Sequence, residues 1–80
     1  MTINLVLFGI AKDIVGTSRS LLEVEDGMLI NEFKQKLVAE YPKMKDLTSI
    51  SFAVGTEYVE DDYQLRHNEE VVIIPPVSGG

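Results

Sequence analysis

The chain has 80 residues, of which 45% are hydrophobic and 25% are charged, and its formal net charge is −6. This length and composition predict one small globular domain with a modest core. The acidic balance argues against binding to nucleic acid or to an anionic membrane surface, because both need basic side chains to neutralise them. With no cysteine, there is no disulfide and no thiol nucleophile. We recognise no signal peptide and no apolar run long enough to cross a bilayer, so a cytoplasmic domain is expected.

The first half of the chain predicts two strands, a helical turn and one longer helix. The first strand alternates, so that Ile3, Leu5 and Leu7 share one face. The longer helix must end near residue 41, because Pro42 disfavours helical geometry in the residue before it. The four segments are residues 2–8, 10–15, 20–25 and 28–41, and the apolar stripe of the longer helix is Ile30, Phe33, Leu37 and Tyr41.

The second half predicts three further strands, at residues 50–54, 58–59 and 71–74. Before the last strand, His67 and Asn68 predict a turn, since Asn tolerates a positive φ. The first and last strands are the most hydrophobic segments, which favours a parallel pair at the centre of the sheet. The predicted fold class is α+β, a mixed sheet packed on one main helix. Residues 1–76 would form the domain and residues 77–80 a flexible diglycine tail.

A single main helix covers only one face of such a sheet, so the other face is left open. Strand alternation places apolar side chains on that face. Contiguous exposed apolar surface more often marks a partner site than an accident. We therefore expect a partner protein to dock there, against Val6, Phe8, Val72 and Ile74.

Side chains suited to catalysis or metal binding are sparse. His67 is the only histidine, and a turn histidine beside Glu69 is typically solvated. No glycine-rich phosphate loop is present. The carboxylates late in the chain lack the spacing of a calcium loop, which favours a solvated surface or one that suits a basic partner. We expect no bound metal or cofactor and no catalysis by the domain alone. These carboxylates are Glu57, Glu60, Asp61, Asp62, Glu69 and Glu70.

The C-terminal segment has the composition of a substrate for another enzyme. Its prolines lack N–H donors, so sheet pairing stops there and the tail projects from the sheet. Its final glycines have no side chain, so the terminal carboxylate can enter a narrow channel. Conversion of that carboxylate to an adenylate makes it reactive toward a sulfur or amine nucleophile. The segment is Pro75, Pro76, Val77, Ser78, Gly79 and Gly80.

Residues 70–80 (EVVIIPPVSGG), together with Leu7-Phe8-Gly9 and residues 13–16, resemble the small, sulfur-carrying subunit of molybdopterin synthase. The resemblance implies a β-grasp (ubiquitin-like) fold. It implies that an ATP-dependent adenylating enzyme activates Gly80 and that a sulfur donor protein supplies the sulfur of a thiocarboxylate. Gly79 would be a narrow spacer as the tail enters the large synthase subunit. There the sulfur would pass to cyclic pyranopterin monophosphate, in molybdenum cofactor biosynthesis. The implied partner contacts are Phe8, Leu65 and Ile74.

Two positions depart from that family's pattern. Lys12-Asp13 stands where an Arg-Glu pair is common, which loses a bidentate guanidinium. His67-Asn68 replaces part of an Asp-Gly-Asp-Glu turn, and Asn is expected to keep the positive φ of the glycine. Three alternatives share some of these features: a ubiquitin-like protein modifier, the thiamine-pathway sulfur carrier, and a pure interaction domain with an idle tail.

Overall fold

The structure of the protein is a computed structural model, which describes residues 1–46 and 50–74. All the predicted strands and helical segments are present, and the 3-10 helix that begins at Pro42 is an addition to the prediction. In chain order the elements are β1 (Thr2–Leu7), α1 (Gly9–Val15), β2 (Arg19–Glu23), α2 (Ile30–Glu40), η1 (Pro42–Asp46), β3 (Ser51–Val54), β4 (Glu57–Val59) and β5 (Glu70–Ile74).

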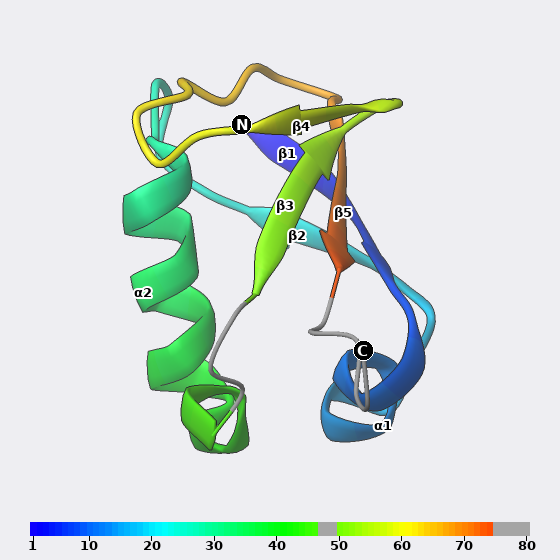
Figure 1. Ribbon diagram of the computed structural model, residues 1–80. Helices are drawn as coiled ribbons and strands as arrows, with labels where there is room; N and C mark the ends of the chain where they lie inside the picture. The colour runs from blue at the N-terminus through cyan, green and yellow to red at the C-terminus, as the bar shows by residue number, and fades with distance from the viewer. Residues whose placement is uncertain (47–49, 75–80) are drawn as a thin grey trace.

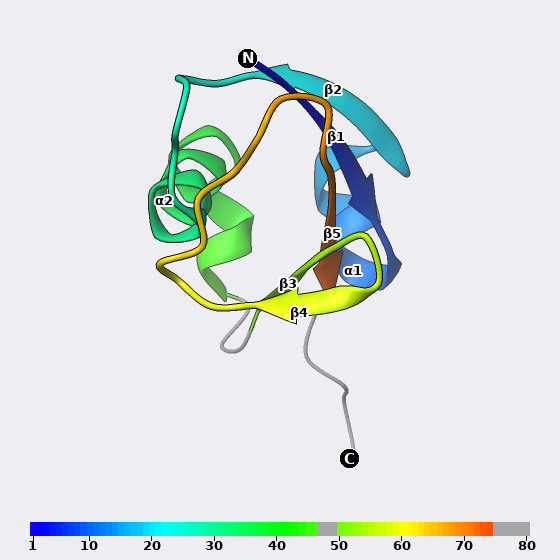
Figure 2. The same cartoon turned by 90° about the horizontal axis from the view of Figure 1, so that it is seen from above.

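The strands form one five-stranded mixed sheet in the order β2-β1-β5-β3-β4. β1 and β5 are parallel neighbours, and every other pair is antiparallel. Figures 1 and 2 show the sheet curled around α2, which lies against one face only. The predicted α+β class and the parallel pairing of the first and last strands are therefore confirmed.

The core lies between α2 and the inner face of the sheet. Ile3, Leu5 and Leu7 of β1 are all fully buried there, as their alternation predicted. From α2, the side chain of Phe33 meets Phe52 of β3 edge to face, with ring centroids 6.1 Å apart and planes at 70°. Such aromatic pairs contribute about 0.5–1.5 kcal/mol beyond their area burial. The helical period and the strand alternation thus identified the two surfaces that pack together.

Helix α2 begins at Ile30, two residues later than predicted, because the chain before it pairs with a distant segment. The carbonyl of Met28 accepts a hydrogen bond from the Leu65 N–H at 2.8 Å, and the Ile30 N–H donates to the Tyr63 carbonyl at 2.9 Å. These contacts hold the preceding residues extended. In the first turn, Glu32 Oε1 accepts a hydrogen bond from the Leu29 N–H at 2.9 Å, where a carboxylate also suits the helix dipole.

Leu65 was expected to contact a partner, and the structure corrects this interpretation. Its side chain is only 2% exposed and belongs to the core cluster. Its backbone N–H is held by the Met28 carbonyl, which fixes the long β4–β5 connection against the start of α2. Because a side chain sealed in this way offers no surface to another protein, Leu65 stabilises the fold.

The turn before β5 has the predicted backbone geometry. Asn68 adopts a φ of 66° and is the only residue other than glycine with a positive φ among the described residues. Its N–H donates to the Thr2 carbonyl at 2.8 Å. His67 lies in the same turn, where its Nδ1 accepts a hydrogen bond from the Thr2 N–H at 3.0 Å. The turn therefore connects the start of β1 to the start of β5.

Candidate functional site

The sheet face opposite α2 carries a row of apolar side chains that crosses four strands. Val6 of β1 pairs with Val72 of β5, Val72 pairs with Ala53 of β3, and Ala53 pairs with Tyr58 of β4. Val6, Val72 and Ala53 each lie next in sequence to a buried core residue, and Tyr58 pairs with Ala53. Because successive side chains of a strand point to opposite faces of the sheet, this row points away from the core. Tyr58 is 72% exposed at the outer end of the row.

Two further apolar residues extend this row toward one end of the central strands. Phe8 directly follows β1 and is 56% exposed, and Ile74 ends β5 and is partly exposed. β1 and β5 are parallel, with Leu7 opposite Ile73, so Phe8 and Ile74 follow at the same end of neighbouring strands. We call this surface the open-face patch. Its more exposed members are Phe8, Tyr58, Val72 and Ile74, and Val6 and Ala53, which are 7% and 6% exposed, form its floor.

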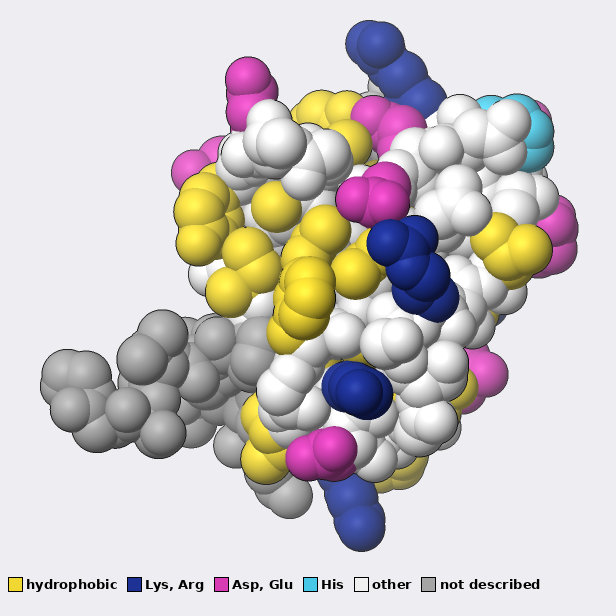
Figure 3. All heavy atoms as spheres, turned by 90° about the vertical axis from the view of Figure 1, so that its right-hand side faces the viewer, with side chains coloured by type: hydrophobic (Ala, Val, Ile, Leu, Met, Phe, Trp, Pro, Cys, Tyr) yellow, Lys and Arg dark blue, Asp and Glu magenta, His cyan; other side chains and the backbone are white. Residues whose placement is uncertain are grey.

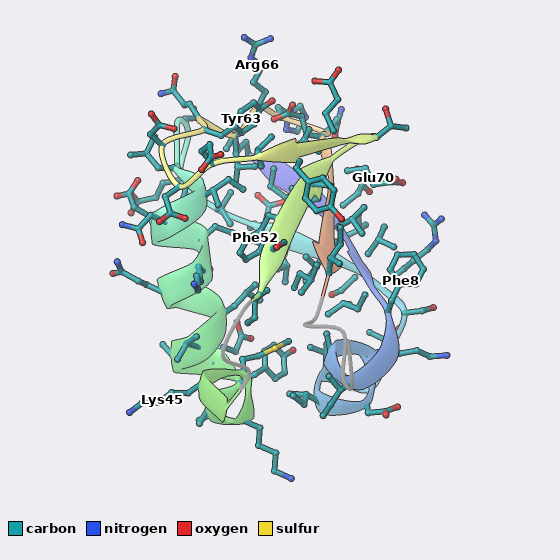
Figure 4. All side chains as sticks on the ribbon, in the orientation of Figure 1. Phe8, Lys45, Phe52, Tyr63, Arg66 and Glu70 are labelled. Atoms are coloured by element: carbon teal, nitrogen blue, oxygen red, sulfur yellow. The ribbon has the colours of Figure 1, made fainter. Side chains whose placement is uncertain are left out.

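Figures 3 and 4 show the arrangement of this face. Apolar side chains gather on the side of the molecule away from α2, with basic and acidic side chains around them (Figure 3). Phe8 and Glu70 lie on that side, whereas Phe52 points toward α2 (Figure 4). A flat apolar area with a charged border is typical of a protein docking surface.

The charged border includes an ion pair between two strands. Arg19 of β2 lies opposite Val6, and its Nη1 is 3.7 Å from Glu70 Oε2. Their side chains are 75% and 47% exposed, so the pair contributes at most about 1 kcal/mol to folding. Both charges therefore remain available to a partner.

The C-terminal segment continues directly from the open-face patch. β5 ends at Ile74 within the patch, so residue 75 continues the chain from that point. The remaining predicted site residues lie outside the described residues, and the same holds for the predicted domain boundary at residue 76. These site residues are Pro75, Pro76, Val77, Ser78, Gly79 and Gly80.

The candidate catalytic and metal-binding side chains have structural contacts instead. The ring of His67 accepts a backbone hydrogen bond, and Glu69 accepts hydrogen bonds from the Tyr63 hydroxyl and the Arg66 N–H. Within residues 1–46 and 50–74, no three His, Cys, Asp or Glu side chains are grouped so that they could hold a metal ion. In the same residues, no helix has the length and apolar character needed to cross a membrane.

Sequence reasoning identified four members of the patch and missed two. Ala53 and Tyr58 were assigned to strands, but their faces were not deduced. The signal was present, because Gly55-Thr56 forms a tight turn that pairs Ala53 with Tyr58. Extending the alternation of residues 50–54 across that hairpin would have placed both side chains on the open face.

Solved structures define the class of fold. The putative molybdopterin converting factor subunit 1 of Pyrococcus furiosus matches with a TM-score of 0.87, at 19% identity over 96% of this chain and 99% of that one. SAMP1 of Haloferax volcanii matches with a TM-score of 0.83, at 18% identity over the whole of both chains. A chain in the complex of subunits 1 and 2 of the molybdopterin-converting factor from Helicobacter pylori matches with a TM-score of 0.68, at 17% identity over both full chains. The fold is the β-grasp, ubiquitin-like fold.

Sequence comparison then identifies the family. The sequence model of the ThiS family matches residues 5–80. The molybdopterin synthase sulfur carrier subunit of Arabidopsis thaliana is 30% identical over 79 residues, which cover 98% of this chain and 82% of the plant protein. That of Chlamydomonas reinhardtii is 30% identical over 83 residues and is covered in full. The chain belongs to the ThiS family.

Proposed function

We propose that this protein is the sulfur carrier subunit of a molybdopterin synthase and acts as a protein co-substrate. The observation that carries the proposal is the full-length similarity to carrier subunits of that synthase. The open-face patch supports it, because the patch lies at the strand end from which the Gly-Gly tail continues. A carrier needs both features, since it must dock on a partner and present its C-terminus to that partner.

The proposed chemistry takes place at the carboxylate of Gly80. An adenylating enzyme joins this carboxylate to the AMP part of ATP and releases pyrophosphate. The terminal sulfur of a donor persulfide then attacks the carbonyl carbon and displaces AMP. A second donor thiol attacks the resulting acyl disulfide, which leaves a thiocarboxylate on Gly80 and a disulfide on the donor. The chain itself has no cysteine, so no thiol of its own competes for the acyl group.

In the synthase, the thiocarboxylate sulfur would bond to a carbon of cyclic pyranopterin monophosphate in place of an oxygen, and water would then hydrolyse the acyl–sulfur bond, so that the sulfur stays on the pterin and Gly80 returns as a carboxylate. The large synthase subunit would cover the open-face patch, with Phe8 and Ile74 as contacts. Phe8 is more than half exposed, and aromatic side chains of this kind often supply a large share of binding energy at interfaces. Tyr58 would make a similar contact at the far end of the patch.

Intact mass spectrometry tests the carrier chemistry. The full chain is incubated with an adenylating enzyme, ATP and a persulfide donor, and its C-terminal peptide is then analysed. The expected product has one oxygen replaced by sulfur in that peptide. Isopeptide-linked conjugates to lysines without any thiocarboxylate would instead assign the chain to the protein modifiers. An unreacted terminus with an active adenylating enzyme would overturn the proposal.

A further inference from the structure

Strand β2 forms one edge of the sheet and has no strand on its outer side within the described residues. The Leu7 N–H donates to the Ser18 carbonyl at 2.9 Å, and the Val24 N–H donates to the Met1 carbonyl at 2.8 Å. In an antiparallel ladder, the residues that bond to the partner strand alternate. The even-numbered residues of β2 therefore bond to β1, and the backbone groups of Arg19, Leu21 and Glu23 point outward.

This edge is only partly protected against pairing. Thr17 Oγ1 contacts the N–H and the carbonyl of Arg19, but the part of the chain that the structure describes provides no hydrogen bond to the outward backbone groups of Leu21. The Leu21 side chain is 70% exposed, in the middle of the strand. Edge strands are normally protected by shortness, charged side chains, a proline or a bulge; β2 is short and carries Arg19 and Glu23, but it has no proline and pairs with β1 without a bulge. The edge is open to another strand at Leu21, and pairing along its whole length would require Thr17 Oγ1 to release Arg19.

We propose that the partner of this edge is a second copy of the same strand, paired antiparallel about a two-fold axis at Leu21. Leu21 then lies opposite Leu21 of the second copy, and each exchanges both backbone hydrogen bonds with the other. In this register Arg19 of one copy lies opposite Glu23 of the other, and the reverse pair forms as well. Both pairs fall on the face that carries the Leu21 side chains, since exposed and partly buried residues alternate along β2.

The charges on β2 select this register over its neighbours. Centring the axis on Arg19 would place two arginines opposite each other, and centring it on Glu23 would do the same with two carboxylates. Like charges directly opposite in a sheet are destabilising, whereas opposite charges are stabilising. An axis at Ser20 or Leu22 would pair neither charge with its opposite, so within β2 only the register centred on Leu21 places a basic residue opposite an acidic one at both ends. The sequence Arg-Ser-Leu-Leu-Glu is thus complementary to itself in the antiparallel direction.

The resulting dimer is weak and leaves most of the open-face patch accessible. The contact involves one short strand per copy, well below the area of a standard stable interface, and two copies of net charge −6 repel each other. Self-association is therefore expected only at high protein concentration. Phe8, Ile74 and Tyr58 of the patch follow β1 or lie on β5 and β4, away from the paired edge.

Sedimentation equilibrium of the full chain tests the proposal, with charge reversals on β2. Arg19→Glu turns two attractive pairs into two repulsive ones, and about tenfold weaker dimerisation is expected. Glu23→Arg is expected to have a similar effect, and the double variant to recover dimerisation, because the pairs are rebuilt with reversed sign. Arg66→Glu is the matched control: it changes net charge as Arg19→Glu does, at an exposed residue outside β2.

A second measurement does not depend on variants. Amide hydrogen exchange at Leu21 should slow as protein concentration rises, whereas exchange in the other edge strand, β4, should not change. A chain that stays monomeric at millimolar concentration would overturn the proposal. A double variant that dimerises no better than the single variants would overturn the register, and equal weakening by Arg66→Glu would assign the effect to net charge alone.

Discussion

The Tyr63 hydroxyl donates a hydrogen bond to Glu69 Oε2 at 2.6 Å, across the loop that joins β4 to β5. Glu69 Oε1 also accepts the Arg66 N–H, so one carboxylate holds two points of this loop. The Glu69 carbonyl in turn accepts the Asn4 N–H at 2.9 Å, which connects the loop to β1. The loop thereby sets where β5 begins, and β5 leads to the open-face patch and the tail.

Removing the Tyr63 hydroxyl should destabilise the fold without changing its shape. Tyr63→Phe deletes the donor of a hydrogen bond to a charged acceptor, which costs about 1–3 kcal/mol. Urea unfolding of the variant and of the parent chain would measure this loss. Tyr58→Phe is a matched control, since Tyr58 is 72% exposed, and a loss of the same size there would contradict the assignment.

The same hydrogen bond predicts a dependence of stability on alkaline pH. The Glu69 carboxylate accepts the Tyr63 hydroxyl, and this hydrogen bond, with burial and the nearby negative charge, raises the pKa of Tyr63 above its usual value of 10.0. A raised pKa in the folded state stabilises the fold below the unfolded pKa, and this stabilisation is lost as pH rises through the folded pKa. The difference in free energy of unfolding between the parent chain and Tyr63→Phe should stay constant up to about pH 10 and then become smaller. A difference that became larger above about pH 10 would show that the hydroxyl is not the group whose pKa is raised by Glu69.

Leu65 should matter for folding and not for binding. Leu65→Ala removes a buried side chain from the core and should cost about 2–5 kcal/mol. Thermal unfolding would measure the loss. At a temperature where the variant is still folded, its affinity for the large synthase subunit should match that of the parent chain. A clear loss of affinity in a folded variant would make Leu65 a partner contact after all.

The fold could be predicted well from the sequence, because the apolar residues closely follow the two-residue alternation of a strand and the 3.6-residue period of a helix. Ile3, Leu5 and Leu7 read as one strand face, and Phe33 and Leu37 as one helix face, so both halves of the core could be found. Leu65 was assigned to the partner interface through the family resemblance alone. It lies in a polar segment with no period, and its burial depends on hydrogen bonds to residues far away in sequence, such as Met28.

The candidate site was only partly predictable for a related reason. Membership of the open-face patch depends on strand register, and register depends on tight turns and on long-range pairing. Alternation within one strand was enough for Val6 and Val72, which lie in long apolar segments. Ala53 and Tyr58 join them only through the β3–β4 hairpin and the β3–β5 pairing.

Charged substitutions in the open-face patch should weaken association with the large subunit. Phe8→Asp and Ile74→Asp each place a carboxylate in a contact that loses water on binding, and an unpaired buried charge is costly. We expect at least tenfold weaker binding by calorimetry, or about 1.4 kcal/mol. Ala39→Asp is the control, because it places the same carboxylate at an exposed residue of α2, on the other side of the sheet. Unchanged affinity for both patch variants would remove them from the interface.

Deleting Gly80 should abolish sulfur transfer and leave folding intact. The deletion leaves the terminal carboxylate on Gly79, one residue short of the position that is proposed to carry the sulfur, and it removes no residue of β5, which ends at Ile74. Thermal unfolding of the truncated chain should therefore match that of the parent, and its affinity for the large subunit should change far less than its activity.

A bulky residue at Gly79, such as Gly79→Val, should also block sulfur transfer, because a branched side chain would obstruct a narrow channel. Sulfur transfer to cyclic pyranopterin monophosphate by the large subunit with each variant provides the readout. Activity retained without Gly80 would mean that the sulfur does not have to be carried at that residue, which would contradict the proposed chemistry.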